Sequence, residues 1–91
     1  MAIRRSRATR RFKKDWRRCE ARGLEMILLR EIMETLLRDD ELDPLRRVHA
    51  LRCEFRDCTE CHVGVDWLLI WRTTEEEIVF VRTGTHDDLF G

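Results

Sequence analysis

The sequence has few residues that interrupt regular structure: one proline and four glycines in 91 residues. It has no repeats, no low-complexity tract and no glycine- or serine-rich linker, which argues against several domains joined by flexible segments. No apolar run approaches the roughly 18 residues that span a membrane, and no signal-peptide core is present. We therefore expect one domain over residues 1–91, without membrane association, in the cytoplasm.

Net charge is also absent, because 18 basic and 18 acidic residues cancel. The two signs are not mixed, however. Residues 1–22 hold ten basic and two acidic residues, and the rest of the chain holds eight basic and sixteen acidic ones. Such asymmetry indicates a polyanionic partner for the N-terminal segment, although a solvated helix face is an equally good interpretation of charge alone. With 43% hydrophobic residues, the chain is not disordered despite its 40% charged content.

The spacing of apolar residues predicts two consecutive helices in the first half. Thr9 offers an N-cap to the first helix, and Gly23 is a natural stop for it. The second helix begins at once and ends at Asp39-Asp40, before Pro44. The apolar stripes are Phe12, Trp16 and Cys19 in the first helix, and Leu29, Ile32, Met33, Leu36 and Leu37 in the second. This pattern predicts a helical hairpin.

The second half changes to strand patterns. Apolar and charged residues alternate over 51–56, and continuous apolar runs follow at 67–71 and 78–81, joined by a polar hairpin at 72–77. Residues 2–7 suit a short edge strand, and residues 86–91 are expected to form a tail after a break at 83–85. Helices before strands indicate an α+β fold, with an antiparallel sheet covered on one face by the helix pair.

The four cysteines give two superficial metal patterns. Cys53, Cys58, Cys61 and His62 spell C-x4-C-x2-C-H, and the end of this run also spells the C-x-x-C-H haem attachment motif. Cys61 and His62 are adjacent, so on a strand they point to opposite faces, and a second cysteine pair is missing. We expect free, half-buried thiols, and neither a metal nor a cofactor.

The three histidines are more informative than the cysteines. His49 precedes a predicted strand, His62 lies at a strand end or turn, and His86 follows the last strand. If the strands are antiparallel neighbours, these side chains converge at one sheet edge with Asp66 and Arg82. Such a cluster suits acid/base cleavage of a phosphodiester, in which one group accepts the ribose 2′-hydroxyl proton and another protonates the leaving 5′ oxygen. Arg82 would then act as a fixed cation for the pentavalent phosphate.

Aromatic residues at the same rim predict contacts to unpaired bases. Trp67 and Phe90 are placed to stack on single-stranded RNA.

Two long motifs resemble the YafQ branch of the RelE/ParE bacterial toxins. The first runs from Cys61-His62 through Asp66-Trp67 to Trp71, and the second is the closing stretch from Arg82-Thr83-Gly84-Thr85-His86 to Leu89-Phe90-Gly91. Phe12-Lys13-Lys14-Asp15, followed by Arg22-Gly23, resembles the first helix of the family and its turn. The resemblance spans nearly the whole chain in the same order.

The resemblance implies a RelE-like fold and a toxin of a type II toxin–antitoxin system. The expected activity is that of a ribosome-dependent endoribonuclease, which cuts mRNA in the A site of the 30S subunit without a metal. The functional positions of the branch fall on His49, His62, Asp66, His86 and Phe90. His86 is then the general acid, Asp66 or His49 the base, and His62 helps to hold the scissile phosphate.

The expected partners follow from the same resemblance. The basic helix, with Arg10, Arg11, Lys13, Lys14 and Arg17, is expected to contact ribosomal RNA phosphates. A cognate antitoxin is expected to wrap the toxin, and the complex to bind operator DNA only through the antitoxin.

Three alternatives stay open at this point. The chain could be a non-enzymatic toxin of the same fold, of the gyrase-inhibitor type, which as a rule lacks the histidine set. It could be an inactive homologue that only binds an antitoxin, because Asp87 and Asp88 follow His86 directly and would repel phosphate. A zinc-binding module is the third.

Overall fold

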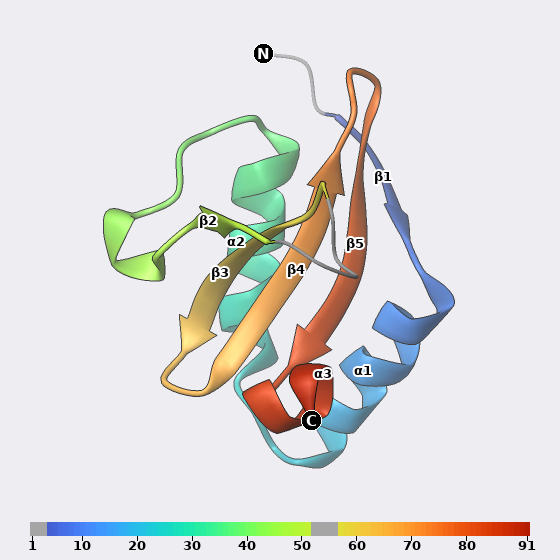
Figure 1. Cartoon of the computed structure of the whole chain (residues 1–91), viewed down its shortest axis with the longest axis vertical. Coiled ribbons are helices and arrows are strands. Elements are labelled where there is room, and N and C mark those ends of the chain that lie inside the picture. Colours follow the sequence, from blue (N-terminus) through green and yellow to red (C-terminus); the bar gives the residue numbers. More distant parts are fainter. Residues whose placement is uncertain (1–3, 52–56) are drawn as a thin grey trace.

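The computed structural model describes residues 4–51 and 57–91, which form a five-stranded sheet with helices on both of its faces (Figure 1). In chain order the elements are β1 (Arg5–Ala8), α1 (Arg10–Ala21), α2 (Met26–Leu37), the 3-10 helix η1 (Pro44–Arg46), β2 (His49–Ala50), β3 (Thr59–Gly64), β4 (Trp67–Thr73), β5 (Glu77–Gly84) and α3 (His86–Phe90). The predicted α+β class is confirmed. Within the described ranges, no helix combines the length and the apolarity that crossing a bilayer requires.

The strands lie in the order β1-β5-β4-β3-β2. Neighbouring strands from β2 to β5 are antiparallel, whereas β1 runs parallel to β5. The prediction of a wholly antiparallel sheet is therefore wrong at one edge. A parallel pair needs a long crossover, and everything between β1 and β5 in the chain provides it. The N-terminal strand does lie at the edge of the sheet, as predicted.

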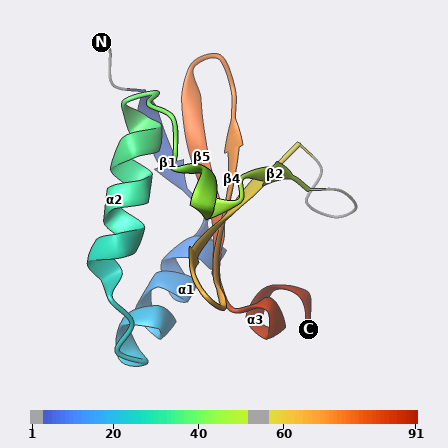
Figure 2. The same ribbon diagram turned by 90° about the vertical axis from the view of Figure 1, so that its left-hand side faces the viewer.

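Helices α1 and α2 form the predicted hairpin and cover one face of the sheet (Figure 2). The hydroxyl of Thr9 caps α1 by accepting a hydrogen bond from the Phe12 N–H at 3.0 Å. Gly23, at a φ of 80°, ends the helix in the left-handed region that glycine adopts without strain. The predicted stripes face inward, because Phe12 and Cys19 of α1 and Leu29, Ile32 and Leu36 of α2 are buried.

Strand β4 is the centre of the protein and is buried on both faces. Its odd-numbered residues, Trp67, Leu69 and Trp71, belong to the core beneath α1 and α2. Leu68 and Ile70 belong to a second, smaller core with Cys58 and Leu89. The continuous apolar run at 67–71 thus predicted a central strand correctly.

The second core exists because the residues after β5 are helical. The sequence predicted a tail at 86–91, but residues 86–90 form α3, and its Leu89 is buried. Thr85 starts the helix with a capping box: its hydroxyl accepts from the Asp88 N–H, and the Asp88 carboxylate accepts from the Thr85 N–H. Because α3 lies across the sheet from α1 and α2 (Figure 2), we call this side the α3 face.

Strands β2 and β3 differ from the prediction. Strand β2 comprises His49–Ala50, before the predicted alternation, and residues 52–56, including Cys53, lie outside the described residues. Strand β3 was not predicted, although His62 lies inside it. Its sequence, TECHVG, has only two strong strand formers and a glycine, and its pairing with β4 overrides that weak local preference.

Candidate active site

Strand β3 places two polar side chains on the α3 face. Side chains alternate along a strand, so the burial of Cys61 and Val63 in the core beneath α1 and α2 puts Glu60 and His62 on the opposite side. The pairing of β3 with β4 supports this orientation. His62 lies opposite Leu68, residues paired in this way point to the same face, and Leu68 belongs to the second core. His62 therefore faces the same side of the sheet as α3.

Asp66 and His86 form the first pair of the site. Asp66 lies in the turn between β3 and β4, and His86 is the first residue of α3. The Asp66 Oδ1 atom lies 3.1 Å from His86 Nδ1 and also accepts the His86 backbone N–H at 3.2 Å. These two bonds, the ring bond first, hold the pKa of Asp66 below its ordinary value. Since the carboxylate accepts, Nδ1 carries a proton, and Nε2 is left to exchange a proton with a substrate.

Two further rings extend this pair into a row. The ring centroids of His62 and His86 are 6.4 Å apart, and those of His86 and Phe90 are 6.1 Å apart. Phe90 is 47% exposed, so its ring is accessible to a base. The structure thus brings together four predicted residues: His62, Asp66, His86 and Phe90.

His49 belongs to a second pair on the same face. In the β2–β3 register it lies opposite Glu60, two residues from His62 along β3. Its Nε2 atom is 2.8 Å from Glu60 Oε2, and its Nδ1 atom is 2.9 Å from the Arg47 carbonyl oxygen. Both ring nitrogens of His49 therefore lie next to oxygen atoms of the protein, which fix the orientation of the ring.

Glu60 was not predicted as a site residue. Its side chain is 5% exposed, and its Oε1 atom has no hydrogen-bond partner among the described residues. A buried carboxylate beside a histidine is typical of functional sites. Because β3 itself was not predicted, no sequence pattern distinguished Glu60 from the fifteen other acidic residues in the acidic part of the chain.

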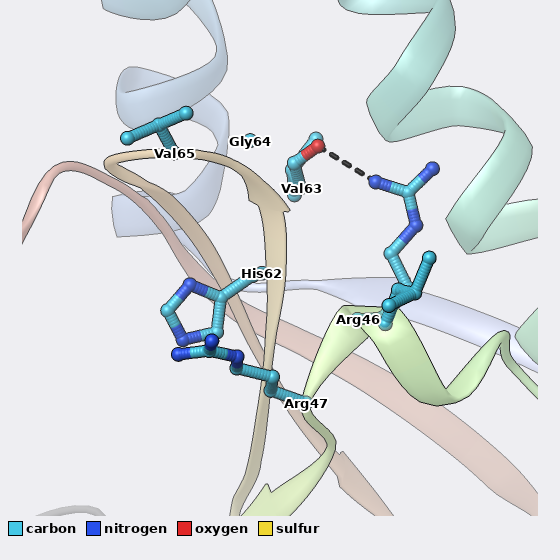
Figure 3. Close-up of a pocket in the computed structure, with 7 residues that line it drawn as sticks. Arg46, Arg47, His62, Val63, Gly64 and Val65 are labelled. Carbon is cyan, nitrogen blue, oxygen red and sulfur yellow. Dashed lines mark hydrogen bonds between the residues drawn. The ribbon is translucent and has the colours of Figure 1, made fainter.

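A pocket of about 420 Å³ adjoins His62 between η1 and the end of β3 (Figure 3). Arg46 donates to the Val63 carbonyl at 2.8 Å, whereas the guanidinium of Arg47 lies beside the His62 ring. The remaining lining residues are Leu45, Gly64 and Val65. The pocket therefore joins a cation and an imidazole at one opening.

Trp67 does not form part of the accessible site, and the prediction that it stacks on RNA bases is wrong. The residue is 5% exposed, and its indole N–H donates to the Thr83 hydroxyl at 2.9 Å. The continuous run at 67–71 places it in the larger core, where its ring packs beneath α1 and α2.

Arg82 is likewise buried, and this position contradicts its predicted role as a cation for the transition state. Its Nε and Nη2 atoms donate to the Asp15 carboxylate at 2.6 and 3.0 Å, in a bidentate pair between β5 and α1. Asp15 also accepts from Arg18 and from the Thr83 N–H. The sequence could not show this pairing, which joins residues 67 positions apart.

The basic residues of α1 divide into two groups. Arg18 and Arg22 bond to Asp15 and Asp88. The five predicted RNA contacts are all exposed, and we call them the basic face: Arg10, Arg11, Lys13, Lys14 and Arg17. This face belongs to a helix on the side of the sheet opposite the histidines (Figure 2).

The two aspartates after His86 have different environments. Asp88 accepts from Arg22 at 2.7 and 3.1 Å and closes the capping box with Thr85, so its charge is neutralised within the fold. The Arg22 guanidinium in particular holds the pKa of Asp88 well below its ordinary value. Asp87 is exposed. Only Asp87 therefore adds an uncompensated charge beside His86.

The described cysteines do not assemble a metal site. Cys58 and Cys61 belong to the two different cores, on opposite faces of the sheet. Burial raises the pKa of the Cys61 thiol to about 12, which disfavours the thiolate that binds metal. Among the described residues, no three histidine, cysteine or acidic side chains gather as metal ligands. Cys53, the first cysteine of the predicted pattern, lies outside them.

Comparison with known proteins identifies relatives along nearly the whole chain. The family model described as "Bacterial toxin of type II toxin-antitoxin system, YafQ" matches residues 4–91. The chain is 33% identical over 81 residues to the "mRNA interferase toxin YafQ" of Escherichia coli strain B / BL21-DE3, covering 88% of each protein.

Two solved structures have the same fold. The crystal structure of YafQ from E. coli BL21(DE3) superposes with a TM-score of 0.92 at 30% identity, covering 97% of this chain and 99% of the other. The E. coli DinJ–YafQ toxin–antitoxin complex gives a TM-score of 0.91 at 30% identity, covering 98% and 99%. The fold is therefore RelE-like, as the resemblance implied, and this chain belongs to the YafQ family of toxins of type II toxin–antitoxin systems.

Proposed function

We propose that this toxin is an mRNA interferase, an endoribonuclease that cuts mRNA in the ribosomal A site. The observation that supports the proposal best is the contact of His86 with Asp66 at 3.1 Å, within a row of rings that includes His62 and the accessible Phe90. The related E. coli toxin is named an mRNA interferase. A histidine whose Nε2 atom has no hydrogen-bond partner among the described residues, next to an exposed aromatic ring, suits proton transfer on a single-stranded RNA.

The reaction that fits this arrangement is transesterification. The ribose 2′-oxygen attacks phosphorus and loses its proton to a base, while the bond from phosphorus to the 5′ oxygen breaks. His86 donates a proton to that oxygen, and Asp66 keeps the ring oriented through Nδ1. The products are a 5′-hydroxyl and a cyclic phosphate. His62 helps to hold the phosphate, and Phe90 stacks on a base. No metal takes part.

The general base is Asp66 or His49. Asp66 is ionised and exposed, but one of its oxygens already accepts from His86. His49 is also engaged, through Glu60 and the Arg47 carbonyl. Either residue needs to release one bond to accept a proton from the 2′-hydroxyl, and the pH dependence of cleavage separates the two candidates.

The proposed partners are the ribosome, mRNA and a cognate antitoxin. The basic face of α1 provides five exposed cations for ribosomal RNA phosphates. Their electrostatic attraction to the phosphates weakens as the salt concentration rises. The E. coli relative is found in a complex with the antitoxin DinJ. We propose that an antitoxin likewise covers this toxin and carries the complex to operator DNA, and that both proteins act in the cytoplasm.

The test is to map cleavage sites on an mRNA with and without programmed ribosomes, in the presence of a chelator. His86→Ala is the inactive variant, and Asp87→Ala, a change at the neighbouring exposed residue, is its matched control. We expect cuts by wild type and Asp87→Ala only with ribosomes, and none by His86→Ala. Cuts without ribosomes would refute ribosome dependence, and cuts that disappear in chelator would refute metal independence. Absence of cuts under every condition would refute the enzyme and return attention to a gyrase inhibitor or an inactive antitoxin binder.

A further inference from the structure

The proposed reaction needs a cation that the predicted site does not provide. Charge accumulates on the non-bridging oxygens as phosphorus becomes pentavalent, and a fixed positive group at that point accelerates the step. Arg82 is buried against Asp15, and the α3 face already carries the carboxylates of Glu60 and Asp66. A cation is therefore required on this face near the histidines.

Arg47 is an exposed arginine at this position. It follows η1 and lines the pocket together with His62 (Figure 3). Among the described residues, no carboxylate lies within ion-pair distance of its guanidinium. Its neighbour Arg46 differs, since it donates to the Val63 carbonyl. Arg47 thus has its donors available for a ligand.

The backbone of Arg47 is held in an uncommon conformation. Its φ of 53° and ψ of 56° lie in the left-handed region, which a residue with a Cβ atom adopts at a cost in free energy. The Asp43 side chain starts η1 by accepting from the Leu45 N–H, and the Arg47 N–H closes it on the Pro44 carbonyl. Glycine would suit this turn better, so an arginine here is consistent with a side chain that is needed for function.

Arg47 is also joined to the histidines on both sides. Its side chain and that of His62 line the same pocket, and its carbonyl accepts from the Nδ1 atom of His49 at 2.9 Å. The turn that orients the guanidinium therefore also orients His49.

We infer that Arg47 binds the scissile phosphate together with His62 and stabilises the negative charge of the transition state. The inference rests on the proposed function and names the group that binds the non-bridging oxygens. Arg47 gives up no proton during the step: the base takes the 2′-hydroxyl proton, and His86 supplies the one that the 5′ oxygen receives. Arginine suits this role because its planar fork of donors matches two phosphate oxygens.

The test is single-turnover cleavage at saturating programmed ribosomes, with ribosome affinity and melting temperature measured on the same proteins. Arg47→Gly removes the cation but suits the left-handed turn, so it is expected to fold and to bind ribosomes within about threefold of wild type, yet to cleave about 100- to 1000-fold more slowly. Arg47→Lys keeps the charge and is expected to recover at least about tenfold of that loss. Arg5→Gln removes one exposed charge from β1, at the other edge of the sheet, and is expected to cleave like wild type.

The outcomes separate this inference from the proposed function. If wild type does not cleave under any condition, the proposed function fails and the inference fails with it. If wild type cleaves and Arg47→Gly cleaves equally fast, or loses only ribosome affinity, the inference alone is overturned. Equal rates for Arg47→Lys and Arg47→Gly would show that a positive charge at this position does not accelerate the step, and would also overturn the inference.

Discussion

The Oδ1 atom of Asp66 accepts two hydrogen bonds from His86, one from the backbone N–H and one from the ring. A single carboxylate oxygen thereby joins the turn between β3 and β4 to the start of α3 and sets the orientation of the imidazole. Neither interaction is buried, since the side chains are 64% and 58% exposed. The pair therefore orients a reactive group more than it stabilises the fold.

Replacing Asp66 with asparagine is expected to separate its effect on the orientation of His86 from its effect on the stability of the fold. Asp66→Asn keeps the size of the side chain but removes its charge, so we expect cleavage to fall by at least about 100-fold. The melting temperature should change by only a few degrees, because surface pairs contribute little to stability. Cleavage kinetics and circular dichroism measure the two quantities. An unfolded variant would contradict the separation, and a fully active one would remove Asp66 from the site.

The pH dependence of cleavage distinguishes Asp66 from His49 as the base. Because His86 lowers the pKa of Asp66 below its ordinary value near 4, Asp66 stays ionised throughout the neutral and weakly acidic range. If Asp66 is the base, its protonation cannot reduce the rate until the pH falls below about 4. A decline in single-turnover rate between about pH 7 and 5 that Asp66→Asn does not remove would exclude protonation of Asp66 as its cause, which leaves His49 as the other candidate for the base.

Glu60 is expected to matter for activity more than for stability. Glu60→Gln keeps the shape of the side chain but removes the buried charge that faces His49 at 2.8 Å. We expect cleavage to fall by about tenfold or more, because His49 loses its charged partner. The melting temperature should stay equal or rise, because the change removes a buried negative charge whose second oxygen has no partner in the described part of the chain. Glu34→Gln, an exposed change on α2, is the matched control, and a large loss of stability specific to Glu60→Gln would show that the pair is structural.

Arg82, in contrast to Glu60, is expected to matter for stability more than for activity. Its bidentate ion pair with Asp15 is buried, and removing Arg82 leaves the buried Asp15 carboxylate with the half-exposed Arg18 as its remaining ion-pair partner among the described residues. We expect Arg82→Met to lower the free energy of unfolding by about 3–5 kcal/mol. Urea denaturation measures this loss, with Arg38→Met at an exposed pair as the control. A stable but inactive Arg82→Met would restore the catalytic role that the sequence predicted.

Asp88 is expected to make the toxin sensitive to acid. Its folded pKa is lowered by Arg22, so the folded state keeps the carboxylate charged at pH values where the unfolded chain has bound a proton. The resulting stabilisation is complete above the ordinary pKa near 4 and is lost as the pH falls toward the folded pKa. Asp88→Asn should therefore be less stable than wild type by about 1–2 kcal/mol at pH 7 and should lose less stability between pH 5 and 2. Chemical denaturation at several pH values checks this, and parallel curves for the two proteins would refute it.

The sequence predicted well where local chemistry decides the structure. Thr9 and Gly23 mark the ends of α1 because a cap and a left-handed turn depend on neighbouring residues. The apolar run at 67–71 predicted a strand buried on both faces. Consecutive residues of a strand point to opposite faces of the sheet, so both faces must be covered when all of these residues are apolar. His62, Asp66 and His86 were expected to converge, and they do.

The predictions from the sequence were wrong where contacts between distant segments of the chain determine the structure. Pairing of β1 with β5 and of Arg82 with Asp15 depends on how the whole chain crosses over, and no local pattern encodes that path. Glu60 and Arg47 gain their significance only from β3 and from the turn after η1. Trp67 illustrates the same limit: an aromatic residue at a strand end looks accessible in a sequence, but here it belongs to the core.

The position of β5 between β1 and β4 has a consequence for how the toxin is made. Translation produces β1 first, yet β5, its one neighbouring strand in the described part of the chain, appears some seventy residues later. Until residues 77–84 emerge from the ribosome, β1 has no pairing partner, Asp15 lacks Arg82, and His86 has not been synthesised. A chain that ends before β5 therefore cannot assemble this site.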